Sequence, residues 1–281
     1  MITPTGDAQY VGFLQRALPM MGLRWSGFRK VRGQVIKRIR KRIHDLGLSD
    51  LQSYEQFLAE NQDEWPWLTF LCRVTISRFY RDREVFTRLA GDVLPELADR
   101  ARDRSTGTLR CWSVGSASGE EAYTVSLIWE LLAGIQYPEM SLEILAWDID
   151  PNMISRAEKG CYEWSSIKDL PGAWRTKGFV KNEDRFCLQR NYKDNVTFFR
   201  RDIRSADPDG SFDLILCRNL VFTYFSESLQ AMVLSQLEKS LVFGGALVIG
   251  KHEFLPGQSA SIEPWITNCR IFRKTVLTIQ S

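Results

Sequence analysis

Four short polar stretches follow apolar runs in the C-terminal two-thirds of the chain, and their residue types suit the binding of a nucleoside. The first, Gly115-Ser116-Ala117-Ser118-Gly119-Glu120-Glu121, combines two glycines with small residues, so a ligand can approach the backbone and a helix N-terminus closely. The second begins at Asp148, whose carboxylate can accept hydrogen bonds from ribose hydroxyls. The others contain Asp202-Ile203, which can flank an adenine ring, and Asn219.

The glycine-rich stretch departs from the common phosphate-binding motifs. It is neither Gly-x-Gly-x-x-Gly nor a loop that ends in Gly-Lys-Ser/Thr. Taken alone, the stretch could be an ordinary strand-to-helix turn and Asp148 an ordinary loop residue. Together the four stretches indicate a nucleoside that carries no phosphate, of which S-adenosylmethionine is the common one.

The elements that must position these residues form an alternating pattern. Apolar runs of strand length lie at residues 109–114, 142–147, 196–199, 212–217 and 246–249. Amphipathic helical runs, such as residues 120–133 and 226–241, fall between several of them. This alternation predicts an α/β fold with a parallel sheet covered by helices on both faces. Open sheets of this kind bind ligands at the carboxyl ends of their strands, where the four stretches lie.

The N-terminal third has a helical pattern instead. Apolar residues spaced three and four apart from Val31 to Leu46 predict a helix that ends at Gly47. Ser49 is a candidate cap for the next helix, and Pro66 is expected to open a third. The sequence pattern changes from helical to alternating strands and helices near residues 88–105. We therefore predict a helical domain of residues 1–90 and a second domain of residues 91–281.

Positive charge is concentrated in the predicted helical domain. The chain has 37 basic and 34 acidic residues, a net charge of +3. Nine of the basic residues lie between Arg24 and Arg42 with no acidic residue among them. A solvated helix face, a nucleic-acid site and a site for an acidic protein partner all fit this charge, and the pattern alone leaves the three open.

Cysteine and histidine usage gives no sign of a disulfide framework or a metal site. The six cysteines include no Cys-x-x-Cys pair, and the two histidines are far apart. We therefore expect reduced cysteines, mostly in the core, and no bound metal. The chain shows neither a signal-peptide pattern at its start nor an apolar run of membrane-spanning length. The expected location is the cytoplasm, without membrane insertion.

Four longer phrases carry a resemblance to a known family. They are Ser77-Arg78-Phe79-Tyr80-Arg81-Asp82, Gly115-Ser116-Ala117-Ser118-Gly119-Glu120-Glu121-Ala122-Tyr123, Asp148-Ile149-Asp150 and Phe212-Asp213-Leu214-Ile215-Leu216-Cys217-Arg218-Asn219. From about residue 28 to residue 253 the sequence resembles the chemotaxis receptor methyltransferases of the CheR type. These enzymes methylate receptor glutamates with S-adenosylmethionine.

The resemblance implies a class I (Rossmann-like) methyltransferase sheet joined to a small all-helical N-terminal domain. It implies S-adenosylmethionine as the cofactor and S-adenosylhomocysteine as the product. The glycine-rich stretch contributes Gly115 and Ala117 to the expected cofactor site. The resemblance adds the cofactor contacts Thr75, Ser77, Arg81, Glu121, Asp148, Asp202, Ile203, Arg218 and Asn219.

The resemblance also bears on partners. In the family, the basic N-terminal helix is thought to meet the methylation region of the receptor's coiled coil, which favours an acidic helical partner over nucleic acid. The substrate-binding residues implied here are Arg29, Lys30, Arg32, Lys37, Arg38, Arg40, Lys41 and Arg42. Residues 178–196 resemble the family's inserted β-hairpin, but the turn Lys181-Asn182-Glu183-Asp184 lacks glycine. We therefore expect no docking on a receptor's C-terminal pentapeptide.

The implied reaction is in-line displacement of the sulfonium methyl group by a glutamate carboxylate of a chemoreceptor. A glutamate with a pKa of about 4.3 is ionised at neutral pH, so no general base is needed. Arg81 would orient that carboxylate, and Tyr224 takes the place of the family's active-site tyrosine, although one extra residue separates it from Asn219. Asp148 and Glu121 would hold the ribose hydroxyls and the ammonium group between them. The alternatives are another acceptor (a small molecule, another protein or RNA) and a non-catalytic S-adenosylmethionine sensor.

Overall fold

The computed structural model describes residues 6–257, 259 and 261–275. The chain divides into two compact units. The helical unit comprises the residues up to Thr75 together with Thr223–Leu229, and the sheet unit comprises Ile76–Phe222 and the residues from Gln230 onward. The sequence-based boundary at residue 90 differs from this division because Phe79, Tyr80, Val85 and Phe86 are buried in the core of the sheet unit.

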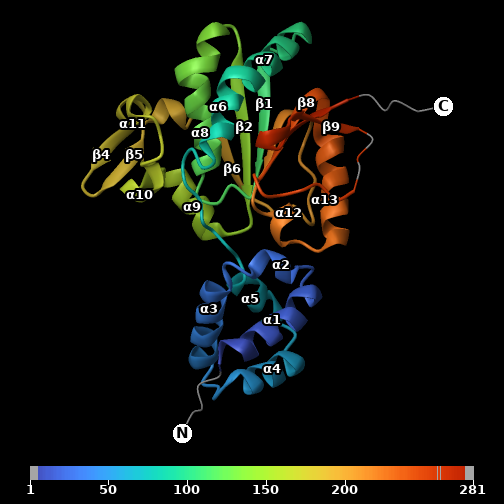
Figure 1. The fold of residues 1–281 in the computed structure, drawn as a ribbon. Coiled ribbons are helices and arrows are strands. Elements are labelled where there is room, and N and C mark those ends of the chain that lie inside the picture. The colour runs from blue at the N-terminus through green and yellow to red at the C-terminus, as the bar shows by residue number, and fades with distance from the viewer. Residues whose placement is uncertain (1–5, 258, 260, 276–281) are drawn as a thin grey trace, which may run out of the picture. The chain divides into compact units, whose positions relative to one another are not determined.

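Among its described residues, the helical unit contains five helices before the chain enters the sheet unit. They are α1 (Asp7–Met20), α2 (Trp25–Phe28), α3 (Arg32–Asp45), α4 (Leu51–Glu60) and α5 (Glu64–Leu71) (Figure 1). On α3, Val35, Ile36, Ile39 and Ile43 are buried, which confirms the apolar stripe that the spacing predicts. The basic side chains occupy the remaining faces of the same helix.

The ends of these helices match the sequence-based expectations in part. Gly47 has a φ of +71° and its N–H donates to the carbonyl of His44, so it ends the helix as predicted. The cap of α4 is Asp50, whose side chain accepts from the backbone N–H of Ser53 at 2.8 Å; the assignment of this cap to Ser49 is wrong. Pro66 lies in the first turn of α5, which begins at Glu64.

The sheet unit is built on a mostly parallel sheet. Among the described residues its strand order is β6-β2-β1-β7-β8-β10-β9. The strands β6, β2, β1, β7 and β8 are parallel, whereas β10 is antiparallel to both of its neighbours. The bounds are β1 (Thr108–Val114), β2 (Ser141–Asp148), β6 (Val196–Arg200), β7 (Phe212–Cys217), β8 (Leu241–Ile249), β9 (Ile262–Ile266) and β10 (Ile271–Lys274).

The sheet unit also contains helices, most of which flank this sheet (Figure 1). They are α6 (Arg83–Arg88), α7 (Leu94–Asp103), α8 (Glu120–Ile128), α9 (Pro151–Lys159), α10 (Trp164–Ile167), α11 (Gly172–Gly178), α12 (Val221–Tyr224) and α13 (Glu227–Ser240), of which α12 and α13 each lie partly in the helical unit. Of these, α7 packs on β1, β7 and β8, and α8 packs on β2 and β6. The predicted α/β fold is therefore confirmed. No helix in the described part of the chain has the length and apolar composition that crossing a membrane requires.

The strand order places the candidate site at the middle of the sheet. The chain moves from β1 outward to β2 and β6, and then returns to the other side of β1 with β7. The order in which strands are added therefore reverses between β1 and β7. A reversal of this kind opens a crevice at the carboxyl ends of the strands. Every side chain of β7 is buried, as expected of a central parallel strand.

A second, smaller sheet stands apart from the main one (Figure 1). Its order is β3-β5-β4, with β3 (Cys161–Tyr162), β4 (Phe179–Asn182) and β5 (Arg185–Leu188). Cys161 lies opposite Cys187 in this sheet, and the two form a disulfide. The expectation of reduced cysteines is thus wrong for this pair, because antiparallel pairing brings together two residues 26 positions apart. The cysteines at positions 72, 111, 217 and 269 are free and buried.

Candidate active site

The glycine-rich stretch forms the turn from β1 into α8. Gly115 and Gly119 have φ values of +71° and +87°, a region that disfavours other residues. A Cβ atom on Gly119 would lie 2.8 Å from the ring of Phe198, so this position requires glycine on two grounds. The N–H groups of Gly115 and Ser116 both donate to the carbonyl of Trp147, at 2.8 and 2.9 Å. The turn is thereby fixed to the end of β2.

Asp148 ends β2 directly beside this turn. One carboxylate oxygen accepts from the N–H of Ala117 at 2.9 Å, and the other accepts from the N–H of Asp150 at 2.8 Å. Hydrogen bonds from two backbone groups hold the carboxylate in a single orientation at the strand end. The structure therefore brings together Asp148, Gly115 and Ala117, which were predicted as one site.

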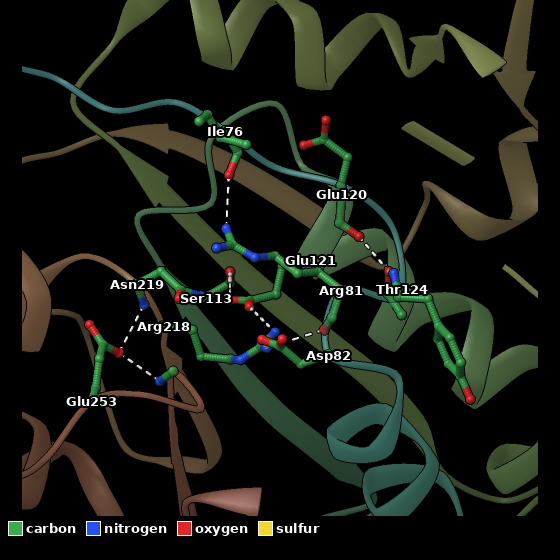
Figure 2. Close-up of polar contacts among 12 residues, drawn as sticks. Ile76, Arg81, Asp82, Ser113, Glu120, Glu121, Thr124, Arg218, Asn219 and Glu253 are labelled. Carbon is green, nitrogen blue, oxygen red and sulfur yellow. Dashed lines mark hydrogen bonds and ion pairs between the residues drawn. The ribbon is translucent and has the colours of Figure 1, made fainter. Parts of the chain in front are cut away.

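Arg218 joins three segments of the sheet unit at the other side of β1. Its guanidinium donates to Glu121 at 2.9 Å, to Asp82 at 2.6 Å and to the carbonyl of Arg81 at 3.2 Å (Figure 2). Glu121 lies in the first turn of α8, Asp82 precedes α6, and Arg218 follows β7. The Arg218 side chain is only 2% exposed, and the ring of Phe86 lies 5.1 Å below it. Arg218 is thus a buried cation between two carboxylates.

The surroundings of Glu121 act on its pKa in opposite directions. Burial raises the pKa of Glu121, while the charge of Arg218 and its hydrogen bond oppose that rise. Ser113 adds a hydrogen bond at 3.3 Å to the second carboxylate oxygen. The ionised form of this buried acid therefore depends on Arg218.

Asn219 adopts an unusual backbone conformation at the end of β7. Its φ is +57°, and its N–H donates at 2.9 Å to the buried carboxylate of Glu253 (Figure 2). The N–H of Gly250 donates to the same oxygen at 2.6 Å. Glu253 therefore joins the turns that follow β7 and β8, and it holds the backbone that presents Asn219.

Asp202 and Ile203 follow β6, which pairs with β2. The register places Arg200 opposite Asp148, so this turn begins beside the Asp148 strand end. Arg204 binds the carboxylate of Asp202 through its Nε and Nη2 atoms, at 2.7 to 3.1 Å. Ile203 is buried. The residues predicted to flank an adenine ring thus lie just after the strand that pairs with the one ending at the predicted ribose carboxylate.

A pocket of about 370 Å³ in the sheet unit contains an excess of positive charge. It is lined by Arg78, Tyr80, Arg81, Asp82, Arg83, Asp169, Asn219, Lys251 and His252. Both acids of the pocket have a partner, since Asp82 binds Arg218 and Asp169 binds Arg78 at 3.2 Å. Within the described part of the chain, Arg81, Arg83 and Lys251 have no carboxylate within ion-pair distance. The pocket therefore suits an anionic group.

Arg81, the predicted carboxylate-orienting residue, lies in this pocket. Its Nη1 donates to the carbonyl of Ile76 at 3.0 Å, which fixes the guanidinium (Figure 2). Ser77 lies in the same segment, close to the carboxyl of Glu120, to which the hydroxyl of Ser118 donates at 3.0 Å. Thr75 is the last residue of the first stretch of the helical unit.

Tyr224, the predicted catalytic tyrosine, belongs to the helical unit. Its ring centroid lies 5.0 Å from that of Phe28, and its carbonyl accepts from the N–H of Arg24 at 2.8 Å. These contacts give the side chain a packing role, and the catalytic role stays a prediction.

The basic residues from Arg29 to Arg42, on α3 and just before it, separate into two groups. Arg38, Arg40, Lys41 and Arg42 make polar contacts within the helical unit. The strongest are those of Arg42, which binds the buried Glu64 through two atoms at 3.0 and 2.7 Å. In the other group, Arg32 contacts the carbonyl of Arg29, and the exposed side chains of Arg29, Lys30 and Lys37 have no ion-pair partner among the described residues.

The sequence-based reasoning missed three contributors to the site. Asp82 was considered only as the end of a motif and as a candidate ion-pair partner of Arg81, whereas it binds Arg218. Glu253 was assigned no role in the site, and Tyr162, which donates to the carbonyl of Ser118 at 2.7 Å, was not considered. The family phrase around Asp82 was the available signal for the first of them. The places of Glu253 and Tyr162 in the site depend on tertiary contacts, which no local sequence pattern indicates.

Comparisons with known proteins agree with this geometry. The family model described as "CheR methyltransferase, SAM binding domain" matches residues 75–268. A probable chemotaxis protein methyltransferase of Rhizobium etli is 32% identical over 236 residues, covering 81% of this chain and 86% of that protein. The chemotaxis protein methyltransferases of Listeria monocytogenes and Escherichia coli are similar as well. The former is 32% identical over 183 residues (65% of this chain, 66% of that protein), and the latter is 28% identical over 230 residues (79% and 76%).

The matched region contains the glycine-rich turn, Asp148, the Arg218 network and the cationic pocket. The resemblance stated from the sequence is therefore confirmed, and the chain belongs to the CheR methyltransferase family.

Proposed function

We propose that this protein transfers the methyl group of S-adenosylmethionine to glutamate side chains of chemoreceptors. The observation that carries the proposal is the cationic pocket, which shares Asn219 and Asp82 with the strand-end network. A pocket with surplus positive charge beside a nucleoside site suits an acceptor that is itself an anion. The names of the relatives support the choice of chemoreceptors as the acceptor.

The residues at the strand ends fit the cofactor. S-adenosylmethionine supplies a sulfonium-bound methyl group that a nucleophile can displace. The oriented carboxylate of Asp148 suits ribose hydroxyls, and the mostly buried Glu121 adds negative charge for a cationic cofactor. The turn at residues 115–119 has no lysine for a phosphate, in keeping with a nucleoside that carries none.

The acceptor needs orientation more than activation. A glutamate side chain is ionised at neutral pH, so the protein need not remove a proton from it. Arg81 is held by the carbonyl of Ile76 and keeps further N–H groups for a planar carboxylate. Arg83 and Lys251 add charge in the same pocket. The work of this site is therefore to hold an anion and a methyl donor in line.

The proposal is tested by incubating the purified protein with methyl-labelled S-adenosylmethionine and chemoreceptor-containing membranes. We expect labelled carboxyl methyl esters that mild alkali releases as methanol. Label that resists alkali would indicate a different acceptor, and cofactor binding without any transfer would indicate a sensor. Either of these results would contradict the proposed reaction.

The unpaired basic residues of the helical unit lead to a prediction about the acceptor. We expect Lys37→Glu to raise KM for the receptor by about two- to fivefold with kcat unchanged, because exposed charges act on encounter more than on chemistry. The measurement is steady-state methylation at low salt, and the difference should shrink at high salt.

The matched control is Lys239→Glu, which makes the same charge change at an exposed position on α13. We expect the parent KM for this control. Equal KM values for the two variants would show that α3 does not attract the acceptor by charge. Arg42 is unsuited to this test because its bond to the buried Glu64 makes it structural.

A further inference from the structure

The glycine-rich turn is supported from behind by a tyrosine of the small sheet. Tyr162, in β3, is 2% exposed, and its hydroxyl donates to the carbonyl of Ser118 at 2.7 Å. Ser118 follows Ala117, whose N–H orients the carboxylate of Asp148. A shift of Ser118 therefore also moves the neighbouring Ala117, whose N–H holds the carboxylate of Asp148.

Aromatic packing fixes the phenol in this position. The ring of Phe79 lies 4.8 Å from the Tyr162 ring in an edge-to-face arrangement, and the N–H of Phe79 donates to the carbonyl of Ser166 at 3.0 Å. Burial raises the pKa of Tyr162 well above its ordinary value, so the hydroxyl remains a donor at any working pH. Tyr162 thus joins the small sheet to the cofactor turn by a permanent hydrogen bond.

The strand that carries Tyr162 is very short. β3 pairs with β5 at two positions, Cys161 with Cys187 and Tyr162 with Phe186. The disulfide therefore lies at one of the two pairs and next to Tyr162 in the chain. Both cysteines of this bridge are partly exposed, so a soluble reductant can reach it.

We propose that Tyr162 is a positioning residue for the cofactor turn and that the Cys161–Cys187 disulfide holds it there, so that cofactor affinity depends on the redox state of this pair. A dithiol reduces the bridge: its two sulfurs pass two electrons and two protons to the cysteines and close into the reductant's own disulfide. The inference rests on the proposed cofactor and is independent of the acceptor.

The first test removes the hydroxyl alone. We expect Tyr162→Phe to raise the Kd for S-adenosylhomocysteine by about two- to tenfold in calorimetry, the worth of one hydrogen bond. KM for S-adenosylmethionine should rise in proportion, with KM for the acceptor unchanged. The control is Tyr137→Phe, which loses an equivalent bond from a buried tyrosine to the carbonyl of Pro95 (3.0 Å). It should bind the product with the parent Kd.

The second test uses the parent protein and needs no folded variant of Tyr162. Under denaturing, non-reducing conditions we expect four titratable thiols, and six after treatment with dithiothreitol. Reduction should raise the Kd for S-adenosylhomocysteine about as much as Tyr162→Phe does. The double variant Cys161→Ser/Cys187→Ser should match the reduced parent and show no response to the reductant.

The outcomes separate this inference from the proposed function. An unchanged Kd for Tyr162→Phe, six thiols before reduction, or equal Kd values for the oxidised and reduced parent would each overturn the inference and leave the methyltransferase proposal intact. A parent protein that binds no S-adenosylhomocysteine in either form would overturn both.

Discussion

Arg218→Met is expected to lower the free energy of unfolding by about 3–5 kcal/mol, because it leaves two mostly buried carboxylates without their cation. Arg218 is 2% exposed and donates to both Glu121 and Asp82, which are 14% and 25% exposed. Methionine approximates the length of the arginine stem and packs against Phe86, so the loss reports mainly on charge. Urea unfolding followed by circular dichroism measures the effect.

The loss should depend on pH in a defined direction. Without Arg218, burial loses its main opposing influence and raises the pKa of Glu121 further in the folded protein. The folded variant then binds a proton more tightly than the unfolded chain does, so its stability falls as pH rises above the ordinary carboxyl pKa of about 4.3. The deficit relative to the parent should be smallest near pH 5 and should grow towards pH 8.

A surface pair provides the control for this prediction. Arg88 binds Asp92 at 3.0 Å, and both side chains are about half exposed. Arg88→Met should cost less than about 1 kcal/mol. A similar loss for both arginine variants, or a deficit for Arg218→Met that does not change with pH, would show that charge burial is not the dominant role of Arg218.

Asp148→Ala is expected to weaken binding of S-adenosylhomocysteine by about a hundredfold or more. Hydrogen bonds to a charged group contribute about 1.5–3 kcal/mol each, and a ribose diol offers two hydroxyls. The substitution also leaves the N–H groups of Ala117 and Asp150 without their acceptor, so the glycine-rich turn loses its orientation. Calorimetry with the purified protein gives the Kd.

Two further variants sharpen this measurement. Asp148→Asn retains one acceptor oxygen and should fall between Asp148→Ala and the parent. Asp194→Ala removes an exposed aspartate that pairs with Arg190 at 3.5 Å, and it should leave the Kd unchanged. If Asp148→Ala kept a Kd within about threefold of the parent, the strand-end acid would not be a cofactor ligand.

Hydrophobic patterning was enough to predict the central sheet. Buried parallel strands are continuous apolar runs, and residues 212–217 were assigned to the same bounds that β7 has in the structure. β9 and β10 were missed because they are short, partly exposed and antiparallel. β9 lies at the edge of the sheet, where a proline within a strand is tolerated. Pro264 was therefore the sequence signal for an edge strand at this position.

The site was less predictable than the fold because its polar partners are distant in sequence. Arg218 lies 97 residues from Glu121 and 136 from Asp82, and no local pattern specifies such pairs. The family phrases contained both acids without saying that they share one guanidinium. The Cys161–Cys187 bridge was missed for the same reason, since it follows from strand pairing and not from a cysteine spacing.

The helical unit is assembled from two separate stretches of the chain, one ending at Thr75 and one spanning Thr223–Leu229. Phe225 forms a bridge with Leu23, and the N–H of Ser226 donates to the carbonyl of Gly22 at 2.8 Å. No single proteolytic cut can therefore release this unit whole. Removal of the first 75 residues would therefore leave the second stretch without its packing partners Gly22 and Leu23.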